Sequence, residues 1–342
     1  MDIEQKNIDN HGSRFDYIDL CKVLAMFLVT WAHCAQQISG RSFPNMLLTK
    51  DVFISINMPI FMIASGFVVN LDKMKRGTVR DYLISKFCRL ILPMTTWYLI
   101  LSVTIFPRHI GYWDAYWYLS ALFVCLVIIK LLLCIFSTPQ KIMIVSTLIL
   151  TIIPLSIFER SCFMIPFIWG GFWLRKYIDK IDWKVVGVLL LIYGLLYFFW
   201  KVDYSVYISP FNILNVNAHS LFCLFYRFSI GFVGGVAFIV FLRLLMCEPC
   251  GKYLKCLSKY GNYTLVFYTM SFVLNAVIAR VLWHYDDFYI NMKGLLDIVS
   301  FVITGLMMMV MYYFQKIVGN SKMLSKFILG NALITPTNNN KK

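Results

Sequence analysis

The sequence has 342 residues, of which 60% are hydrophobic and only 14% are charged, and its mean hydropathy is +0.71. A soluble domain contains roughly 45–50% apolar and about 25% charged residues, so this composition excludes a soluble globular protein. The formal net charge of +15 is explained by basic residues that orient a membrane protein. Binding to nucleic acid is therefore not expected.

Apolar blocks of about 20 residues, the length that crosses the hydrocarbon core of a bilayer, recur along the chain. They predict an all-α polytopic membrane protein that folds as a bundle of about ten transmembrane helices. The predicted spans are residues 18–39, 51–71, 84–105, 115–136, 141–158, 161–179, 184–201, 219–246, 262–283 and 294–316. The fifth and sixth are the least regular, because Pro154 and Pro166 interrupt them. The first is not a cleaved signal peptide, since further spans follow it.

Lysine and arginine are distributed unevenly between the two sides of these spans. Most of them, including Lys130, fall on the side of the N-terminus, and fewer, including Arg227, fall on the opposite side. The first group also contains Lys73, Lys75, Arg76 and Arg80, which precede the third span. By the positive-inside rule, this asymmetry places both chain ends in the cytoplasm. We expect a cytoplasmic segment at residues 1–17, a transmembrane domain at 18–317 and a cytoplasmic tail at 318–342.

The first span carries Lys22 near one end of its apolar run and His33 near the other. Eleven positions separate them, which is three helical turns plus about 20°, so both lie on one helix face and about 16 Å apart along the axis. An ionisable residue within a membrane is a functional candidate, and neutral imidazole can take a proton from an alcohol. A hydrogen bond between packed helices, or a pH sensor, would also explain His33.

The second and third spans contribute a small-residue surface and a pair of cations. Ser65-Gly66 in the second span allows another helix or a ligand to approach closely. Lys86 and Arg89 at the start of the third span are three residues apart, so they share a helix face. Arginine is suited to bidentate contacts with phosphate. Together with Lys22, this pair predicts a site for a polyanion that arrives from the cytoplasm.

Other motifs give no support to several classes of protein. Cys247-Glu-Pro-Cys250 has metal-like spacing, but no second pair and no nearby histidine completes a site, so no metal is predicted. The sequence contains no G-x-S-x-G, H-E-x-x-H or P-loop pattern. Hydrolases, metalloproteases and nucleotide-driven motors therefore have no motif support.

Taken together, these stretches resemble the integral-membrane acyltransferase 3 family, whose members typically O-acetylate bacterial surface glycans. RFDYIDLCKVLAMFLVTWAH resembles the opening signature of the family, with motif positions at Arg14, Asp19, Lys22 and His33. MPIFMIASGF resembles the second-span element, and SKFCRLILP resembles the Arg-x-x-Arg element of the third span, with Lys86 in place of the first arginine. WYLSALF and IPFIWGGFWL are similar to two later elements.

The resemblance implies an O-acyltransferase whose donor is cytoplasmic acetyl-CoA or another acyl-CoA, used as a substrate and not held permanently as a cofactor. The residues that would bind the donor are Lys22, Lys86, Arg89 and Arg14. His33 would be the catalytic base for the acceptor hydroxyl or a transient acyl carrier, and Asp19 would assist by orienting the basic cluster. The residues that would contact the substrates are Ser65, Trp117 and Tyr268.

The implied acceptor is a hydroxyl of a cell-surface or lipid-linked glycan, and the implied location is the inner (plasma) membrane, among its lipids. The oligomeric state stays open. A transporter or flippase for an anionic glycan precursor would use the same buried cations, although paired spans in two halves, usual in transporters, are not evident. A membrane sensor or scaffold is the third interpretation.

The sequence departs from the family pattern in two respects. GNYTLVFYTMS corresponds to a late-span motif that often ends in histidine, with Tyr268 kept and Ser271 at the histidine position. Lysine at positions 22 and 86 keeps the charge of arginine but loses its bidentate fork. We therefore expect a donor affinity that differs from that of relatives, and no firm role for a second histidine.

Overall fold

The computed structural model describes residues 15–38, 48–104, 112, 116–153, 156–205, 211–282 and 293–330. Within these ranges the chain is helical and contains no strand. The first part forms α2 (Asp16–Ile38), α3 (Leu48–Phe67), α4 (Leu71–Arg76), α5 (Val79–Lys86), the π-helical turn η2 (Phe87–Ile91), α6 (Leu92–Thr104), α8 (Trp117–Leu132), α9 (Pro139–Ile152) and α10 (Ser156–Tyr177). The rest forms η3 (Ile178–Lys180), α11 (Trp183–Phe198), η4 (Val202–Tyr204), η5 (Ile213–Asn215), α12 (Ala218–Cys247), α13 (Gly251–Ser258), η6 (Lys259–Tyr263), α14 (Thr264–Leu282), α16 (Lys293–Gly319) and α17 (Lys322–Leu329).

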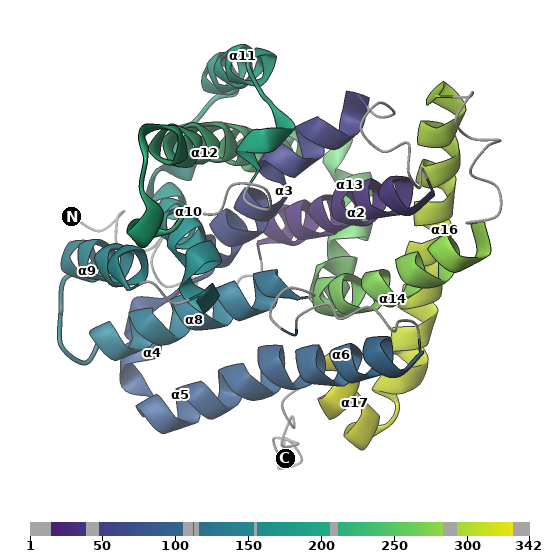
Figure 1. Ribbon diagram of the computed structural model, residues 1–342, viewed down its shortest axis with the longest axis horizontal. Coiled ribbons are helices and arrows are strands. Elements are labelled where there is room, and N and C mark those ends of the chain that lie inside the picture. The colour runs from purple at the N-terminus through teal and green to yellow at the C-terminus, as the bar shows by residue number, and fades with distance from the viewer. Residues whose placement is uncertain are drawn as a thin grey trace.

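These helices gather into one bundle around α2, which packs against α3, α14 and α16 (Figure 1). Each predicted span overlaps a helix or a run of helices in the described part of the chain, although the fifth, 141–158, extends past the end of α9 at Ile152 into the start of α10. Four helices are long and apolar enough to cross a membrane, namely Asp16–Ile38, Ala218–Cys247, Gly251–Ile278 and Leu296–Gly319. The chain is therefore a helical membrane protein, whereas the count of about ten spans and the cytoplasmic position of both ends remain predictions.

One outer helix shows the surface that a bilayer requires. Along α11, the exposed side chains include Val188, Leu191 and Leu195, which lie on one helix face. Large exposed apolar faces mark contact with a partner or with lipid. In a chain of this composition, the exposed face of α11 fits contact with lipid.

Glycine makes the tightest contacts between α3 and α10. Gly66 on α3 lies against the backbone of Ile168, and Gly171 on α10 lies against the backbone of Ile63. A Cβ atom at either glycine would overlap the facing carbonyl oxygen. The two helices therefore approach through small residues, as is common in membrane bundles. This contact fixes the helix that carries Ser65.

Gly171→Ala is expected to lower the free energy of unfolding by at least about 3 kcal/mol, because overpacking costs about 1–3 kcal/mol even where flexible side chains can yield. At Gly171 the added Cβ would meet the backbone of Ile63, which cannot yield in this way. Thermal unfolding of the purified protein measures the effect. Gly187→Ala on α11 is the matched control, since the structure describes no atom within 4 Å of its added Cβ. Equal unfolding temperatures for the two variants would contradict this account of the α3–α10 contact.

Two cations that were counted by the side of the membrane on which they fall, Lys130 and Arg227, are buried. Lys130 on α8 is 2% exposed, and its Nζ donates to the carbonyl oxygens of Met74 (2.5 Å) and Gly77 (2.6 Å). Carbonyls at a helix C-terminus lack partners within the helix, so Lys130 fixes the corner between α4 and α5. Arg227 on α12 is 4% exposed, and its Nε donates to the carbonyl oxygen of Tyr204 at 2.5 Å. Both charges are stabilised by carbonyl oxygens that other elements bring to them.

Candidate active site

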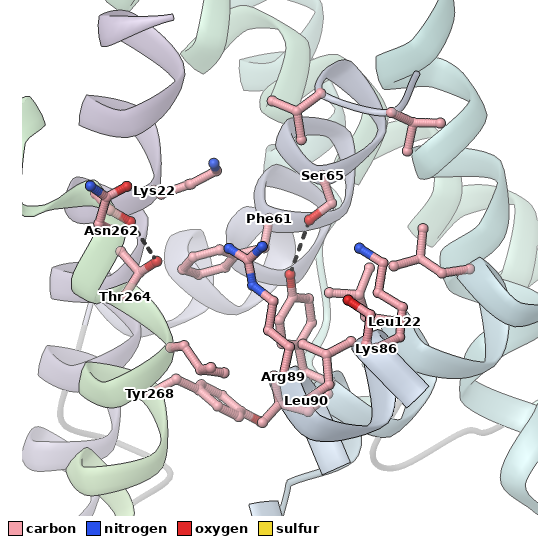
Figure 2. Close-up of a pocket in the computed structure, with 18 of the residues that line it drawn as sticks. Lys22, Phe61, Ser65, Lys86, Arg89, Leu90, Leu122, Asn262, Thr264 and Tyr268 are labelled. Atoms are coloured by element: carbon pink, nitrogen blue, oxygen red, sulfur yellow. Dashed lines mark hydrogen bonds between the residues drawn. The ribbon is translucent and has the colours of Figure 1, made fainter. Parts of the chain in front are cut away.

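A cavity of about 620 Å³ lies between α2, α3, the α4–α5 corner, η2, α8 and the start of α14. Its polar lining consists of Asp19, Lys22, Ser65, Asn70, Lys73, Ser85, Lys86, Arg89, Asn262 and Thr264, and its aromatic lining of Phe61, Tyr82, Tyr118 and Tyr268. We call it the basic cavity. Figure 2 shows the head groups of Lys22, Lys86 and Arg89 turned toward the same space from separate elements.

The basic cavity brings together residues that are far apart in the sequence and that were predicted to form a site. They are Asp19, Lys22, Ser65, Lys86, Arg89 and Tyr268. Arg14 lies outside the described residues. Trp117 is buried, with the Arg160 guanidinium 5.6 Å from its ring centre, and its neighbour Tyr118 lines the cavity in its place.

Positive charge dominates this cavity. Four cations, Lys22, Lys73, Lys86 and Arg89, line it together with a single acidic residue, Asp19, among the residues described. The Asp19 carboxylate lies 3.5 Å from Lys22 Nζ, and Lys86 Nζ lies 5.4 Å from the ring centre of Tyr82. An excess of lysine and arginine at the wall of a cleft attracts and holds an anion of several charges.

Glycine also fixes the end of α2 that faces the cavity. Gly261 in η6 packs directly on Asp19, and an added Cβ would fall 2.5 Å from Asp19 Cβ. Asp19 itself is 7% exposed. The first turn of α2 is therefore held against the start of α14, and Lys22, one turn later, has a defined position at the cavity wall.

Arg89 is placed by an irregular piece of helix. The chain forms a π-helical turn at Phe87–Ile91 between α5 and α6, and such turns are frequent at functional sites. The C-terminal helix α17 packs on this turn and on α6, and Trp97 Nε1 donates to the carbonyl oxygen of Ile328 at 3.1 Å. Gly330 follows with a φ of 66°, and an added Cβ would fall 2.5 Å from the carbonyl oxygen of Arg89. The predicted tail thus contains a helix that braces the Arg89 turn.

A row of aromatic rings connects the basic cavity with His33. Ring centres are separated by 5.5 Å for Phe61 and Tyr118, 5.6 Å for Tyr118 and Tyr268, and 5.7 Å for Tyr268 and Phe272. The last contact joins Phe272 to the imidazole of His33 at 5.3 Å. These rings form an unbroken wall from the cavity to the imidazole.

His33 lies beyond the cavity on the same helix face of α2 as Lys22. It is half-buried, and the helix geometry places it about 16 Å from Lys22 along the axis. Asp19 is fourteen residues from His33, about 21 Å along the same helix. Asp19 therefore contacts the basic cluster through Lys22 and is too distant to touch a group that contacts His33.

The sequence did not single out several residues of the basic cavity. Lys73 was interpreted as an ordinary positive-inside residue, and Tyr82, Asn262 and Thr264 carried no motif. Tyr118 falls in the stretch WYLSALF, where the sequence assigned it no role. The short helix α4, capped by Asn70 Oδ1, which accepts from Lys73 N at 2.9 Å, brings Lys73 to the rim. A polar N-cap residue followed by a turn of basic residues was the sequence signal that could have identified Lys73 as part of the site.

A helical membrane bundle with a cationic cavity and an aligned histidine fits an enzyme that acts on an anionic, membrane-accessible substrate. The acyltransferase domain family matches residues 15–314. The chain belongs to this family, the acyltransferase 3 family, and is a membrane acyltransferase. No curated protein and no solved structure matches the chain.

Proposed function

We propose that this acyltransferase moves an acetyl group from cytoplasmic acetyl-CoA to a hydroxyl of a cell-surface or lipid-linked glycan, as a multi-pass protein of the inner membrane. The observation that carries this proposal is the basic cavity, which gathers four cations on the same side of the bundle as the Lys22 end of α2. CoA carries several phosphate charges at one end and its thioester at the other. The cavity suits the phosphates.

The aromatic wall supports the same arrangement for the rest of the donor. An extended arm that begins in the basic cavity and follows Tyr118, Tyr268 and Phe272 arrives at His33. The long chain between the phosphates and the thioester of CoA suits this path. The proposal therefore assigns binding to the cations and chemistry to the imidazole, with the donor spanning the distance between them.

His33 acts in this proposal as a general base. Its neutral imidazole takes the proton of the acceptor hydroxyl, and the oxygen attacks the thioester carbonyl carbon. The bond between carbon and sulfur then breaks, and the CoA sulfur receives the proton from the imidazolium. Lys22, Lys86 and Arg89 hold the phosphates throughout, and Asp19 keeps Lys22 oriented.

Transfer of labelled acetate tests this function. Membrane vesicles from cells that express the protein, and from cells that do not, are incubated with CoA carrying a radiolabelled acetyl group. We expect alkali-labile label in the glycan fraction of the first preparation only, with release of free CoA. Equal labelling of the two preparations would overturn the proposal. Binding of acetyl-CoA without its consumption would favour a transporter for an anionic precursor.

A further inference from the structure

Two buried amide side chains lie on α3 and α14, the helices that carry rings of the row between the basic cavity and His33. Asn275 on α14 is 3% exposed, and Asn57 on α3 is 5% exposed. Both amide atoms of Asn275 and the Oδ1 of Asn57 are without a hydrogen-bond partner in the described part of the chain. Buried polar groups in native proteins are almost always hydrogen-bonded, so a ligand that reaches these atoms would supply the missing partner.

The position of Asn57 supports this interpretation. It precedes Phe61 by four residues and therefore shares its face of α3, and Phe61 lines the basic cavity. Asn57 is one turn away from the cavity in the direction of the Phe53 ring, which contacts Trp31 of α2 at 5.1 Å. The Oδ1 of Asn57 thus lies between the basic cavity and the part of α2 that carries Trp31.

The position of Asn275 relative to the imidazole follows from Phe272. It follows Phe272 by three residues, so the two share a face of α14, and the Phe272 ring contacts the His33 ring. A helical side chain covers the turn that precedes its own Cα, which directs the Asn275 amide back toward the level of Phe272. α2 and α14 pack directly against each other. The amide and the imidazole therefore face one region.

We propose that Asn275 binds the acyl carbonyl oxygen of the donor and is a catalytic residue of this enzyme. This inference rests on the proposed acetyl transfer. When the acceptor oxygen bonds to the carbonyl carbon, the acceptor proton passes to His33 and the carbonyl electron pair moves onto the carbonyl oxygen. The Asn275 N–H donates to this negatively charged carbonyl oxygen. The carbonyl then reforms, the bond between carbon and sulfur breaks, and the sulfur takes the proton from His33.

A preorganised donor aimed at such an oxygen is a large single contribution to catalysis. Removing one donor of this kind costs about 10²- to 10³-fold in kcat. A group that acts only on the developing charge affects kcat and leaves donor binding unchanged. If the amide served only packing, its loss would change the unfolding temperature and would not lower kcat selectively while leaving donor binding unchanged.

Substitution at position 275 tests the inference through acetyl-transfer kinetics of the purified protein. Asn275→Ala is expected to lower kcat by about 10²- to 10³-fold, with KM and Kd for acetyl-CoA within twofold of the wild type. Asn275→Ser has nearly the same volume as alanine but keeps a hydrogen-bond donor, and we expect it to exceed the alanine variant in kcat by about tenfold. Asn275→Leu is expected to unfold at the same or a higher temperature than the wild type, because it removes an unpartnered buried amide.

Thr269→Val provides the matched control on the same helix. Thr269 is fully buried, and its Oγ1 donates within α14 to the Leu265 carbonyl oxygen at 3.1 Å, so its loss should leave kcat unchanged. Equal kcat in wild type, Asn275→Ala and Asn275→Ser would overturn the inference and leave acetyl transfer intact. A lower unfolding temperature for Asn275→Leu would overturn the inference, because it would show that the Asn275 amide stabilises the fold through a partner within the protein. Absence of transfer in the wild type would overturn the proposed function and this inference together.

Discussion

Arg89→Gln is expected to raise the dissociation constant of CoA by between about 10- and 150-fold, because a hydrogen bond to a charged group contributes about 1.5–3 kcal/mol. Arg89 lies in the π-helical turn and lines the basic cavity with Lys86. The double variant with Lys86→Gln should bind too weakly for titration calorimetry to detect at micromolar protein. The difference between wild type and variant should shrink as salt is raised, since screening weakens contacts between cations and phosphate.

Arg80→Gln is the control for this experiment. Arg80 is an exposed cation on α5, the helix that leads into the Arg89 turn, so it tests the loss of charge alone. We expect its dissociation constant to stay within twofold of the wild type. Equal weakening by Arg80→Gln and Arg89→Gln would contradict a specific phosphate site. Lys86→Arg restores the planar fork that the family carries there, and should tighten binding.

His33→Gln is expected to lower kcat for acetyl transfer by about 10²- to 10⁴-fold, the usual contribution of a positioned general base. Glutamine keeps polarity and approximate size but cannot take the proton of the acceptor hydroxyl. Because His33 lies about 16 Å from Lys22 along α2, the Kd for CoA should not change. The pairing of an unchanged Kd with a lost kcat separates this role from that of Arg89.

Thr30→Val serves as the control for His33. Thr30 is fully buried one turn away on α2, and its Oγ1 donates to the carbonyl oxygen of Met26 at 2.9 Å. Valine has nearly the same shape, so this variant should transfer acetyl groups at the wild-type rate. A comparable loss of kcat in both variants would mean that α2 packing, and not the imidazole, limits the reaction.

The residue at the late histidine position of the family has a local role in this chain. Ser271 is fully buried, and its Oγ donates to the carbonyl oxygen of Tyr268 at 2.9 Å within α14. A hydroxyl committed to its own helix does not act as a base at neutral pH. Ser271 therefore does not replace a second histidine, and the proposed proton transfer falls to His33.

Much of the helical architecture follows from local properties of the sequence. Apolar blocks of membrane length predicted where helices occur, and the spacing of Lys22 and His33 placed both on one face of α2. The expected irregularity at Pro166 does not end a helix, because α10 continues through it. A proline can be tolerated in a membrane helix when neighbouring groups compensate for the lost hydrogen bond.

The parts of the site that depend on tertiary packing were not predictable in this way. Lys130 is buried because Met74 on α4 and the following Gly77 bring two carbonyl oxygens to it. Lys73 and Tyr118 join the basic cavity only because α4 and α8 meet beside η2. Asn275 carries no motif, and its significance comes from its burial and its place next to Phe272. Each of these depends on which helices are neighbours, and periodicity within one helix does not contain that information.

The claim that the His33 imidazole performs acetyl transfer to a surface glycan is tested by measuring ester-linked acetate on that glycan. A strain lacking the protein would be complemented with the wild type, with His33→Ala or with Thr30→Val at matched membrane levels. We predict acetate with the wild type and with Thr30→Val, and none with His33→Ala. Equal acetate in all three complemented strains, or acetate unaffected by the deletion itself, would contradict the claim.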